Sequence, residues 1–470
     1  MNELLGLTLI ELTERLRARA VSPVDLMDAV LARIDATHHD LNAVVAMRDR
    51  EALRDDAKAA AERIARGAAR PLEGVPLGVK DLQDAEGLVT SQGSLPFRER
   101  VARRDSTEVA RLRAAGAIVV GKTNAPEFGY TAITKNLVYG VTHSPWNLKH
   151  TPGGSSGGSA AAMAACVLPL VTASDGGGSI RIPASFTGTF GLKTSYGRVP
   201  RGPFEHWDYG STAVYGPLTK TVEDAALMLD QTAGPSPCDP SSLPHPGVSY
   251  LQRVREPLHS GLRIGYSPDL GYAVVQSDVA AAVEDSVRVF EKLGHRIERI
   301  TGGPPQLGRE WGMLGAFELA SHLHPLLPEH ESKFGRGFLW GVKMGWQMTP
   351  EVWGTAAAQR AHLNEWCAEV FERVDVLVTP TVPYDPPPAG GPFPEETEGR
   401  KQILAGVAAF TIPFNLSWHP AATVRVGLSR NRLPMGMQIV GPRHRDDLVL
   451  QVARAFERER PWHPHWPTSW

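Results

Sequence analysis

Through most of this chain, short apolar runs alternate with segments of helical periodicity. Apolar runs at residues 75–79 and 117–120 are separated by a helical pattern at residues 107–115. The same alternation resumes with an apolar run at residues 262–266 and a helical pattern at residues 277–293. Strands that alternate with helices are typical of an α/β fold, in which helices cover a sheet with parallel or mixed pairing. We therefore expect an α/β protein.

The N-terminal part of the chain has a different pattern, which predicts helices. A Ser-Pro pair at position 22 is a typical helix start, and apolar residues follow it at helical spacing. We expect residues 1–70 to form a helical segment packed on the core and residues 71–470 to form one continuous domain. Prolines are frequent at residues 233–260, but strand patterns resume at once beyond them, which favours a surface loop over a linker.

Charge and cysteine content bear on partners and location. The formal net charge is −2, so no global field attracts nucleic acid or an anionic membrane. Three cysteines without a CxxC pair argue for a reducing compartment. No secretory signal is recognisable, and the longest mostly apolar run, residues 160–173, is too short to span a bilayer. We expect a cytoplasmic protein that binds neither nucleic acid nor a membrane.

Residues 116–123 match the phosphate-binding pattern GxxxxGK[ST] in full. That pattern requires a flexible loop after a strand and a helix that starts at the lysine. Here the four intervening residues are Ala-Ile-Val-Val, which predict a strand, and Pro126 opposes a helix beginning at Lys122. A nucleotide-binding module would rest on this match alone, so we interpret Lys122 as structural.

Residues 154–158 fit the pattern GxSxG, with Ser156 as a candidate nucleophile. In α/β-hydrolases such a serine directly follows a buried strand. The residues before this block, 146–152, predict a polar loop instead, although a helical pattern does follow. Ser156 is therefore kept as an alternative nucleophile, but the missing strand counts against it.

A third arrangement joins three separate segments. Lys80 follows an apolar run, residues 152–159 form a Gly/Ser-rich block, and three glycines directly precede Ser179. Because glycines leave backbone N–H groups unshielded, these groups can converge on one oxygen as an oxyanion hole. A serine hydroxyl needs a base to react, and a lysine whose pKa is lowered by burial can serve through a second hydroxyl. The three glycines are Gly176, Gly177 and Gly178.

These segments resemble the amidase signature family. The resemblance implies a single large α/β domain with a central mixed β-sheet flanked by helices, in which residues 71–470 are the amidase catalytic domain. It extends over about residues 22–460. The matching stretches are residues 74–81, 121–124, 152–162 and 174–184, with weaker matches at residues 375–380 and 433–441.

The resemblance implies a Ser–Ser–Lys triad. By position, Ser179 is the nucleophile, Ser155 is the bridging serine after a cis peptide bond to Gly154, and Lys80 is the base. The implied activity is hydrolysis of carboxylic amides through a Ser179 acyl-enzyme, without a cofactor or a metal. A small-molecule amide is then the binding partner, and a homodimer is left open.

Two positions depart from the family pattern. Gly176 stands where many members carry a larger residue, which could loosen the oxyanion loop or open room beside it. Lys193-Thr194-Ser195 lacks the proline often found after that lysine. Neither departure touches the triad, so both concern the fine geometry of the site.

An aromatic-rich insert is expected at about residues 301–370. Its aromatic side chains could form a wall of an apolar acyl pocket or could be ordinary core residues. A pocket of this kind would favour aryl or hydrophobic amides. Tyr130 and Thr131 lie near the site by resemblance and are candidate substrate contacts. The aromatic residues of the insert are Trp311, Phe334, Phe338, Trp340, Trp346, Trp353 and Trp366.

Two alternatives to a metal-free amidase are a metal site and the glutaminase subunit of an amidotransferase. The sixteen histidines include no HExxH motif, so packing or surface roles are favoured over a metal site. The glutaminase subunit of a tRNA-dependent amidotransferase would share the triad but deliver ammonia to a partner. Residues 331–346 do not resemble the basic helical stretch expected of that subunit, so we favour a stand-alone amidase.

Overall fold

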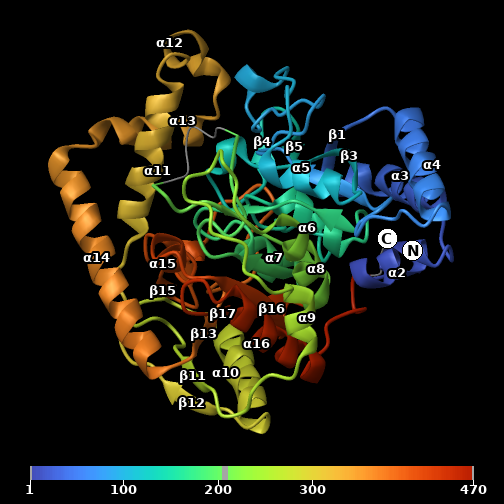
Figure 1. Ribbon diagram of the computed structural model, residues 1–470. Coiled ribbons are helices and arrows are strands. Elements are labelled where there is room, and N and C mark those ends of the chain that lie inside the picture. Colours follow the sequence, from blue (N-terminus) through green and yellow to red (C-terminus); the bar gives the residue numbers. More distant parts are fainter. Residues whose placement is uncertain (1–2, 204–209, 468–470) are drawn as a thin grey trace.

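Seven strands form the larger sheet of the computed structural model, which describes residues 3–203 and 210–467 (Figure 1). Strand β11 pairs in parallel with β12 and β13, whereas the other pairs are antiparallel. The sheet is therefore mixed, as expected. Across it, the strands are β10 (Leu218–Thr219), β8 (Phe190–Lys193), β16 (Ala421–Leu428), β17 (Pro434–Val440), β13 (Val376–Pro380), β11 (Arg263–Tyr266) and β12 (Arg296–Arg299).

A second sheet of four strands continues this layer. Its central strand β2 pairs in parallel with β3 and β6, while β1 pairs antiparallel with β3. Strand β6 lies beside β10 of the larger sheet. The strands are β1 (Val44–Met47), β3 (Ile118–Thr123), β2 (Pro76–Lys80) and β6 (Leu170–Val171). Three short pairs add β4 (Lys135–Asn136) with β5 (Gly140–Val141), β7 (Ser174–Asp175) with β9 (Val214–Tyr215), and β14 (Glu396–Thr397) with β15 (Arg400–Lys401).

Helices surround the sheets and form two outer groups on opposite sides of the molecule (Figure 1). One group is N-terminal: α1 (Glu3–Gly6), α2 (Leu9–Arg17), α3 (Pro23–Leu41) and α4 (Arg50–Ala65). The other is α11 (Gly308–Leu323), α12 (Leu327–His330), α13 (Arg336–Met344) and α14 (Pro350–Arg373). The remaining helices are α5 (Thr107–Ala114), α6 (Gly157–Ala164), α7 (Arg181–Thr187), α8 (Val222–Thr232), α9 (Tyr250–Arg255), α10 (Ser277–Lys292), α15 (Ile412–Leu416) and α16 (Asp446–Glu459).

Helix α3 begins where the sequence predicts. The hydroxyl of Ser22 accepts the backbone N–H of Val24 at 3.1 Å, and Pro23 occupies the first turn, where its missing N–H costs nothing. The helix ends at Asn42, whose left-handed conformation stops the helical hydrogen-bond pattern.

One hydrophobic cluster joins the N-terminal helices to the sheets and to the last helix. It includes Leu12 of α2, Val79 of β2, Ala161 of α6 and Phe456 of α16. A core shared by elements from both ends of the chain makes this a single domain. The boundary at residue 70 stays a prediction. Within the described ranges, no helix is long and apolar enough to cross a membrane.

Two expected elements differ in the structure. The N-terminal segment was expected to be helical only, but it also contains β1, which is held by antiparallel pairing with β3. A strand of four residues is too short for its periodicity to be recognised, and its partner lies far along the chain. Within the apolar run at residues 160–173, only residues 170–171 form a strand, β6, which pairs with β2. Helix α9 interrupts the proline-rich loop at residues 233–260.

Candidate active site

Lys80 is the last residue of β2, and its side chain is completely buried. Its backbone N–H donates a hydrogen bond to the hydroxyl of Thr172 at 2.9 Å, which fixes the end of the strand. Burial lowers the pKa of Lys80 to about 7, although the carboxylates of Asp175 and Glu108 act in the opposite direction. A large share of the Lys80 amine is therefore neutral at neutral pH.

Three serine hydroxyls surround the amine of Lys80. The Nζ atom lies 2.9 Å from Ser155 Oγ, 2.8 Å from Ser156 Oγ and 2.9 Å from Ser174 Oγ. Two of these serines come from the Gly/Ser-rich block, and Ser174 begins β7. The structure thus brings Lys80 and Ser155 into direct contact, with Ser156 and Ser174 as further neighbours.

The Gly/Ser-rich block is packed too closely for larger residues. A Cβ atom on Gly158 would lie 2.3 Å from the backbone nitrogen of Asn124, so only glycine allows α6 to approach β3 this closely. The peptide bond between Gly154 and Ser155 is cis, which agrees with the implication of the family resemblance. This packing holds Ser155 beside Lys80.

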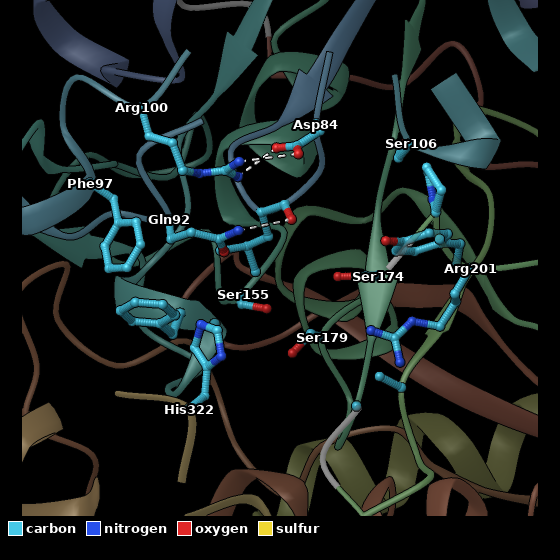
Figure 2. A pocket seen from close by; sticks show the side chains of 18 of the residues that line it. Asp84, Gln92, Phe97, Arg100, Ser106, Ser155, Ser174, Ser179, Arg201 and His322 are labelled. Carbon is cyan, nitrogen blue, oxygen red and sulfur yellow. Dashed lines mark hydrogen bonds and ion pairs between the residues drawn. The ribbon is translucent and has the colours of Figure 1, made fainter. Parts of the chain in front are cut away.

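Ser179 shares a cavity of about 290 Å³ with Ser155 and Ser174. In Figure 2 the hydroxyls of these three serines face the same part of the cavity. The carbonyl oxygen of Ser179 accepts the backbone N–H of Ser156 at 3.2 Å, which ties the Ser179 turn to the Gly/Ser-rich block. The sequence segments that carry Lys80, Ser155 and Ser179 therefore meet at one place.

Aromatic side chains form much of the cavity wall. Phe97 and Phe128 lie on one side with their ring centroids 5.5 Å apart and nearly perpendicular. Tyr215 and Trp311 also line the cavity. Farther from the serines, Arg100 forms an ion pair with Asp84 at 2.6 Å in the same wall (Figure 2). The cavity thus combines aromatic faces with charged groups, since Arg104, Asp105, Arg201 and His322 also line it.

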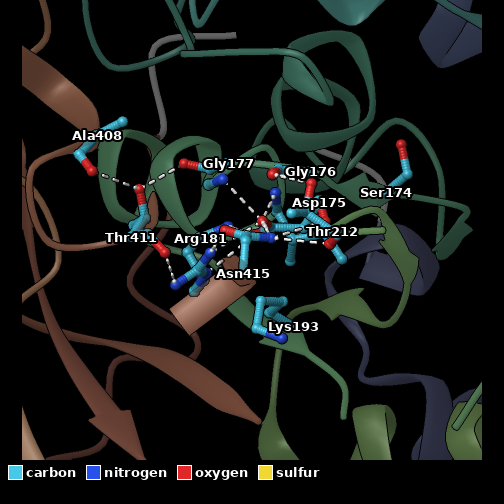
Figure 3. Close-up of polar contacts among 12 residues, drawn as sticks. Ser174, Asp175, Gly176, Gly177, Arg181, Lys193, Thr212, Ala408, Thr411 and Asn415 are labelled. Carbon is cyan, nitrogen blue, oxygen red and sulfur yellow. Dashed lines mark hydrogen bonds and ion pairs between the residues drawn. The ribbon is translucent and has the colours of Figure 1, made fainter. Parts of the chain in front are cut away.

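Asp175 holds the turn that leads to Ser179 (Figure 3). Its carboxylate accepts the backbone N–H of Gly178 at 2.7 Å and that of Ile180 at 3.1 Å. The Arg181 guanidinium forms a buried ion pair with the same carboxylate at 2.9 Å. Burial alone would raise the pKa of Asp175, but the neighbouring Arg181 holds it well below its usual range. Asp175 and Arg181 therefore both pair with each other and orient the turn.

Side chains from the C-terminal part of the chain complete this network. Asn415 donates to the Asp175 carboxylate at 2.9 Å and to its carbonyl oxygen at 3.0 Å. Arg181 also donates to the side-chain oxygen of Gln438 at 2.7 Å. Both buried charges thus have several hydrogen-bond partners, which is the condition under which a buried ion pair is tolerated.

The three glycines before Ser179 differ in the use of their N–H groups. Gly178 donates its N–H to Asp175, so it is not available to a substrate oxygen in this conformation. The N–H groups of Gly176, Gly177 and Ser179 have no hydrogen-bond acceptor in the part of the chain that the structure describes. The Asp175 carboxylate thus binds one of the three glycine N–H groups that were expected to form an oxyanion hole.

The phosphate-binding match at residues 116–123 is a strand, as predicted. Lys122 lies within β3 and is completely buried. Its amine donates to the carbonyl oxygen of Gln83 and, at 3.1 Å, to the hydroxyl of Thr90. These contacts agree with the structural role assigned to Lys122.

Ser156 does not meet the requirements of a nucleophile at a strand–helix turn. It precedes α6, but residues 150–155 before it contain no strand. Its side chain is buried against Lys80 and is not part of the cavity wall. The alternative with Ser156 as nucleophile therefore lacks both the strand and access to a substrate.

Tyr130 and Thr131 are not among the residues that line the cavity, although Gly129 directly before them is. The ring of Tyr130 packs edge-on against Phe338 of α13 with centroids 5.6 Å apart. A substrate contact at either residue stays a prediction. Sequence reasoning missed Phe97 and Phe128, which lie in short 3-10 turns of three residues, where no periodicity marks them.

Some aromatic residues of the insert at residues 301–370 are packed inside the protein, and others are exposed to solvent. Trp311 lines the cavity and Phe338 is buried in a satellite core, whereas Trp340, Trp346 and Trp353 are exposed. Among the residues placed by the structure, no group of three or more histidine, cysteine or acidic side chains is arranged to hold a metal ion.

Known proteins similar to this chain are amidases and amidotransferase subunits. The sequence profile of the Amidase family matches residues 25–450. The acylamidase of Rhodococcus erythropolis is 36% identical over 97% of this chain and 96% of its own length. One subunit of the glutamyl-tRNA(Gln) amidotransferase of Geotalea daltonii is 32% identical over 98% of this chain and 99% of its own length.

A solved structure of an amidase has the same fold as this chain. The crystal structure of a bacterial aryl acylamidase of the amidase signature family superimposes with a TM-score of 0.91 at 29% identity, covering 97% of this chain and 96% of that one. The family profile, the relatives and the fold all indicate the same family. The chain therefore belongs to the amidase signature family and is an amide-hydrolysing enzyme.

Proposed function

We propose that this protein is a stand-alone serine amidase in which Ser179 is the nucleophile, Ser155 relays protons and Lys80 is the base. The observation that carries this proposal is the 2.9 Å hydrogen bond between Lys80 Nζ and Ser155 Oγ, at the cavity that Ser179 also lines. A base, a relay hydroxyl and an exposed nucleophile are the three parts that a serine acyl-transfer site needs.

The neighbours of Lys80 support its role as a base. A neutral amine has two N–H donors and one lone pair. The hydroxyl of Ser156 donates to the carbonyl oxygen of Ser174 at 3.3 Å, so it accepts a hydrogen bond from Lys80. If Ser174 Oγ accepts the second one, the lone pair of Lys80 is left to face Ser155. The lowered pKa of Lys80, about 7, makes this neutral form accessible.

The proposed cycle has two acyl-transfer steps. Lys80 takes the Ser155 proton while Ser155 takes the Ser179 proton, and Ser179 Oγ forms a bond with the amide carbonyl carbon. The proton held by Lys80 returns through Ser155 to the amide nitrogen, the C–N bond breaks, and the amine leaves. Water then attacks the acyl-enzyme by the same route, which releases the acid and restores Ser179.

The oxyanion of each tetrahedral intermediate would be held by backbone donors. Gly176, Gly177 and Ser179 have N–H groups without an acceptor among the described residues. Loss of a single such donor typically costs on the order of 10²–10³ in rate. Gly178 is left out of this set because Asp175 already binds its N–H at 2.7 Å.

We further propose aryl or hydrophobic carboxylic amides as substrates. Phe97, Phe128 and Trp311 give the cavity apolar faces against which an aromatic ring can pack. The relatives named acylamidase and aryl acylamidase support the same class. The cytoplasmic location and the homodimer stay predictions.

A fluorophosphonate label tests the nucleophile directly. The label should be found on Ser179 after peptide mapping, and Ser179→Ala should abolish both labelling and amide turnover while the protein stays folded. Ser156→Ala should still accept the label on Ser179. Recovery of the label on Ser156, or full activity of Ser179→Ala, would refute the assignment.

A second candidate is the glutaminase activity of an amidotransferase, because one relative named for such an enzyme is 32% identical over nearly the whole chain. The two functions differ in their need for a partner. The stand-alone amidase should hydrolyse simple anilides as a purified single protein. A protein that releases ammonia from glutamine only after a partner is added, and leaves anilides intact, would support the second candidate.

A further inference from the structure

Two side chains hold the carbonyl oxygen of Gly176. The indole N–H of Trp311 donates to it at 2.7 Å, and the hydroxyl of Thr212 donates to it at 2.9 Å. Thr212 comes from the segment before β9, whereas Trp311 belongs to α11 of the aromatic-rich insert. Two donors on one carbonyl oxygen define the direction of that C=O bond.

The direction of the Gly176 carbonyl determines the direction of the next N–H. The peptide bond between Gly176 and Gly177 is trans, because it is not among the cis bonds of the chain. In a planar trans peptide the C=O and N–H bonds point in opposite directions. Trp311 and Thr212 therefore aim the N–H of Gly177 away from themselves, and this N–H has no acceptor among the described residues.

The indole of Trp311 also covers Gly177 itself. A Cβ atom at Gly177 would lie 2.5 Å from Cζ2 of the Trp311 ring, so the ring fits only against glycine. Trp311 is at the same time part of the cavity wall. One side chain thus contacts the backbone loop before Ser179 and the space where a substrate would bind.

The following peptide is held in a different way. Thr411 donates to the carbonyl oxygen of Gly177 at 2.6 Å, and Asp175 accepts the N–H of Gly178 at 2.7 Å (Figure 3). Both ends of that peptide are bound by buried residues near Arg181. The peptide between Gly176 and Gly177 has side-chain donors at its oxygen only, which leaves its N–H for a ligand.

We propose that Trp311 is a positioning residue of the oxyanion hole, which fixes the Gly177 N–H through the Gly176 carbonyl. This inference rests on the proposed function, since it presumes that Ser179 forms a tetrahedral intermediate.

Trp311→Phe tests the role of the indole N–H, because it removes the donor and retains an aromatic ring. We expect kcat to fall on the order of 10-fold or more, since misaiming one oxyanion donor weakens binding of the transition state. Affinity for a trifluoromethyl ketone, which forms a tetrahedral adduct, should fall by a similar factor. Affinity for the carboxylic acid product should change less than threefold. The control is Trp353→Phe, an exposed tryptophan of α14, which should change none of these values.

Thr212 supplies a second test on the same carbonyl. Thr212→Val should lower kcat and trifluoromethyl ketone affinity together, and Thr212→Ser should restore both because it keeps the hydroxyl. If both donor-removing variants keep wild-type kcat and ketone affinity, or if Trp311→Phe changes only KM, Trp311 is a cavity wall and the inference is wrong. Full activity of Ser179→Ala would instead overturn the proposed function, so the two failures can be told apart.

Discussion

The amine of Lys80 lies 2.9 Å from the hydroxyl of Ser155, and both residues are buried. Burial of an amine disfavours its charged form, so the same packing that brings Lys80 to Ser155 also lowers its pKa to about 7. Position and basicity therefore have one physical cause, which makes the activity of this site sensitive to pH near neutrality.

The first prediction concerns the pH dependence of turnover. Because Lys80 must be neutral to accept a proton, kcat/KM should rise with pH up to about 7 and then level off. Below about pH 6 it should fall close to tenfold per pH unit. A pH–rate profile with an anilide substrate measures this, with circular dichroism at each pH to show that the protein stays folded. A flat profile from pH 5 to 8 would contradict the assignment of Lys80 as the base.

The second prediction concerns the stability cost of the same lysine. Its folded pKa of about 7 lies below the usual 10.5, so the unfolded chain binds more protons between these values. The cost of burying Lys80 is therefore greatest below pH 7 and disappears as the pH rises through 10.5. Lys80→Met should be inactive yet more stable at pH 7, by on the order of a few kcal/mol.

Denaturant unfolding at pH 7 and pH 9 measures this effect. The stability gain of Lys80→Met should be smaller at pH 9 than at pH 7. The free-energy cost of burying Lys80 decreases between pH 7 and pH 10.5, so the substitution removes a smaller cost at pH 9. Lys58→Met is a suitable control, since Lys58 is exposed on α4. A variant at Lys80 that is less stable than the wild type at pH 7 would show that its three hydroxyl contacts outweigh its desolvation.

Local motifs carried the family resemblance that singled out Lys80, Ser155 and Ser179, and the structure brings these residues to one cavity. Lys80 ends an apolar run and Ser179 follows three glycines, and both patterns depend only on neighbouring residues. The alternation of strands and helices predicted the α/β fold for the same reason. Strand β1 was missed because it depends on pairing with β3 rather than on its own four residues.

Contacts between distant residues were not predictable in this way. Trp311 reaches Gly176 across 135 positions of the chain, and no local pattern indicates that contact. The use of the Gly178 N–H by Asp175 was also missed, because three glycines in a row give no sign of which N–H groups face a ligand. Composition and motif show which residues can react, whereas the direction of each backbone donor depends on the tertiary packing.

The third prediction concerns the buried ion pair of Asp175 and Arg181. Asp175→Asn removes the negative charge and leaves Arg181 buried without its counter-ion. Removal of one partner of a buried pair typically costs about 3–5 kcal/mol. Turnover should fall by a factor on the order of 100 or more, because Gly178 and Ile180 lose a carboxylate acceptor and the Ser179 turn loosens.

Urea unfolding and anilide turnover measure the two effects of Asp175→Asn. The matched control is Glu298→Gln, which breaks the solvent-exposed ion pair between Glu298 and Arg373. Exposed pairs contribute about 0–1 kcal/mol, so this control should alter stability little and activity not at all. Equal effects of the two variants would contradict a special role for the Asp175 network.

The last prediction concerns substrate preference. Phe97 lines the cavity, and its ring meets Phe128 edge-on, so Phe97→Ala removes one apolar face without opening the main core. Loss of packing against a substrate ring of this size is worth roughly 1–2 kcal/mol, which corresponds to about a 5- to 30-fold fall in kcat/KM for anilides. Acetamide and other small amides, which have no ring to pack on Phe97, should be hydrolysed at an unchanged rate. Phe317→Ala, at an exposed phenylalanine of α11 outside this cavity, should leave both substrate classes unaffected. An equal loss for anilides and acetamide in Phe97→Ala would show that Phe97 supports the fold of the site and does not select an aryl substrate.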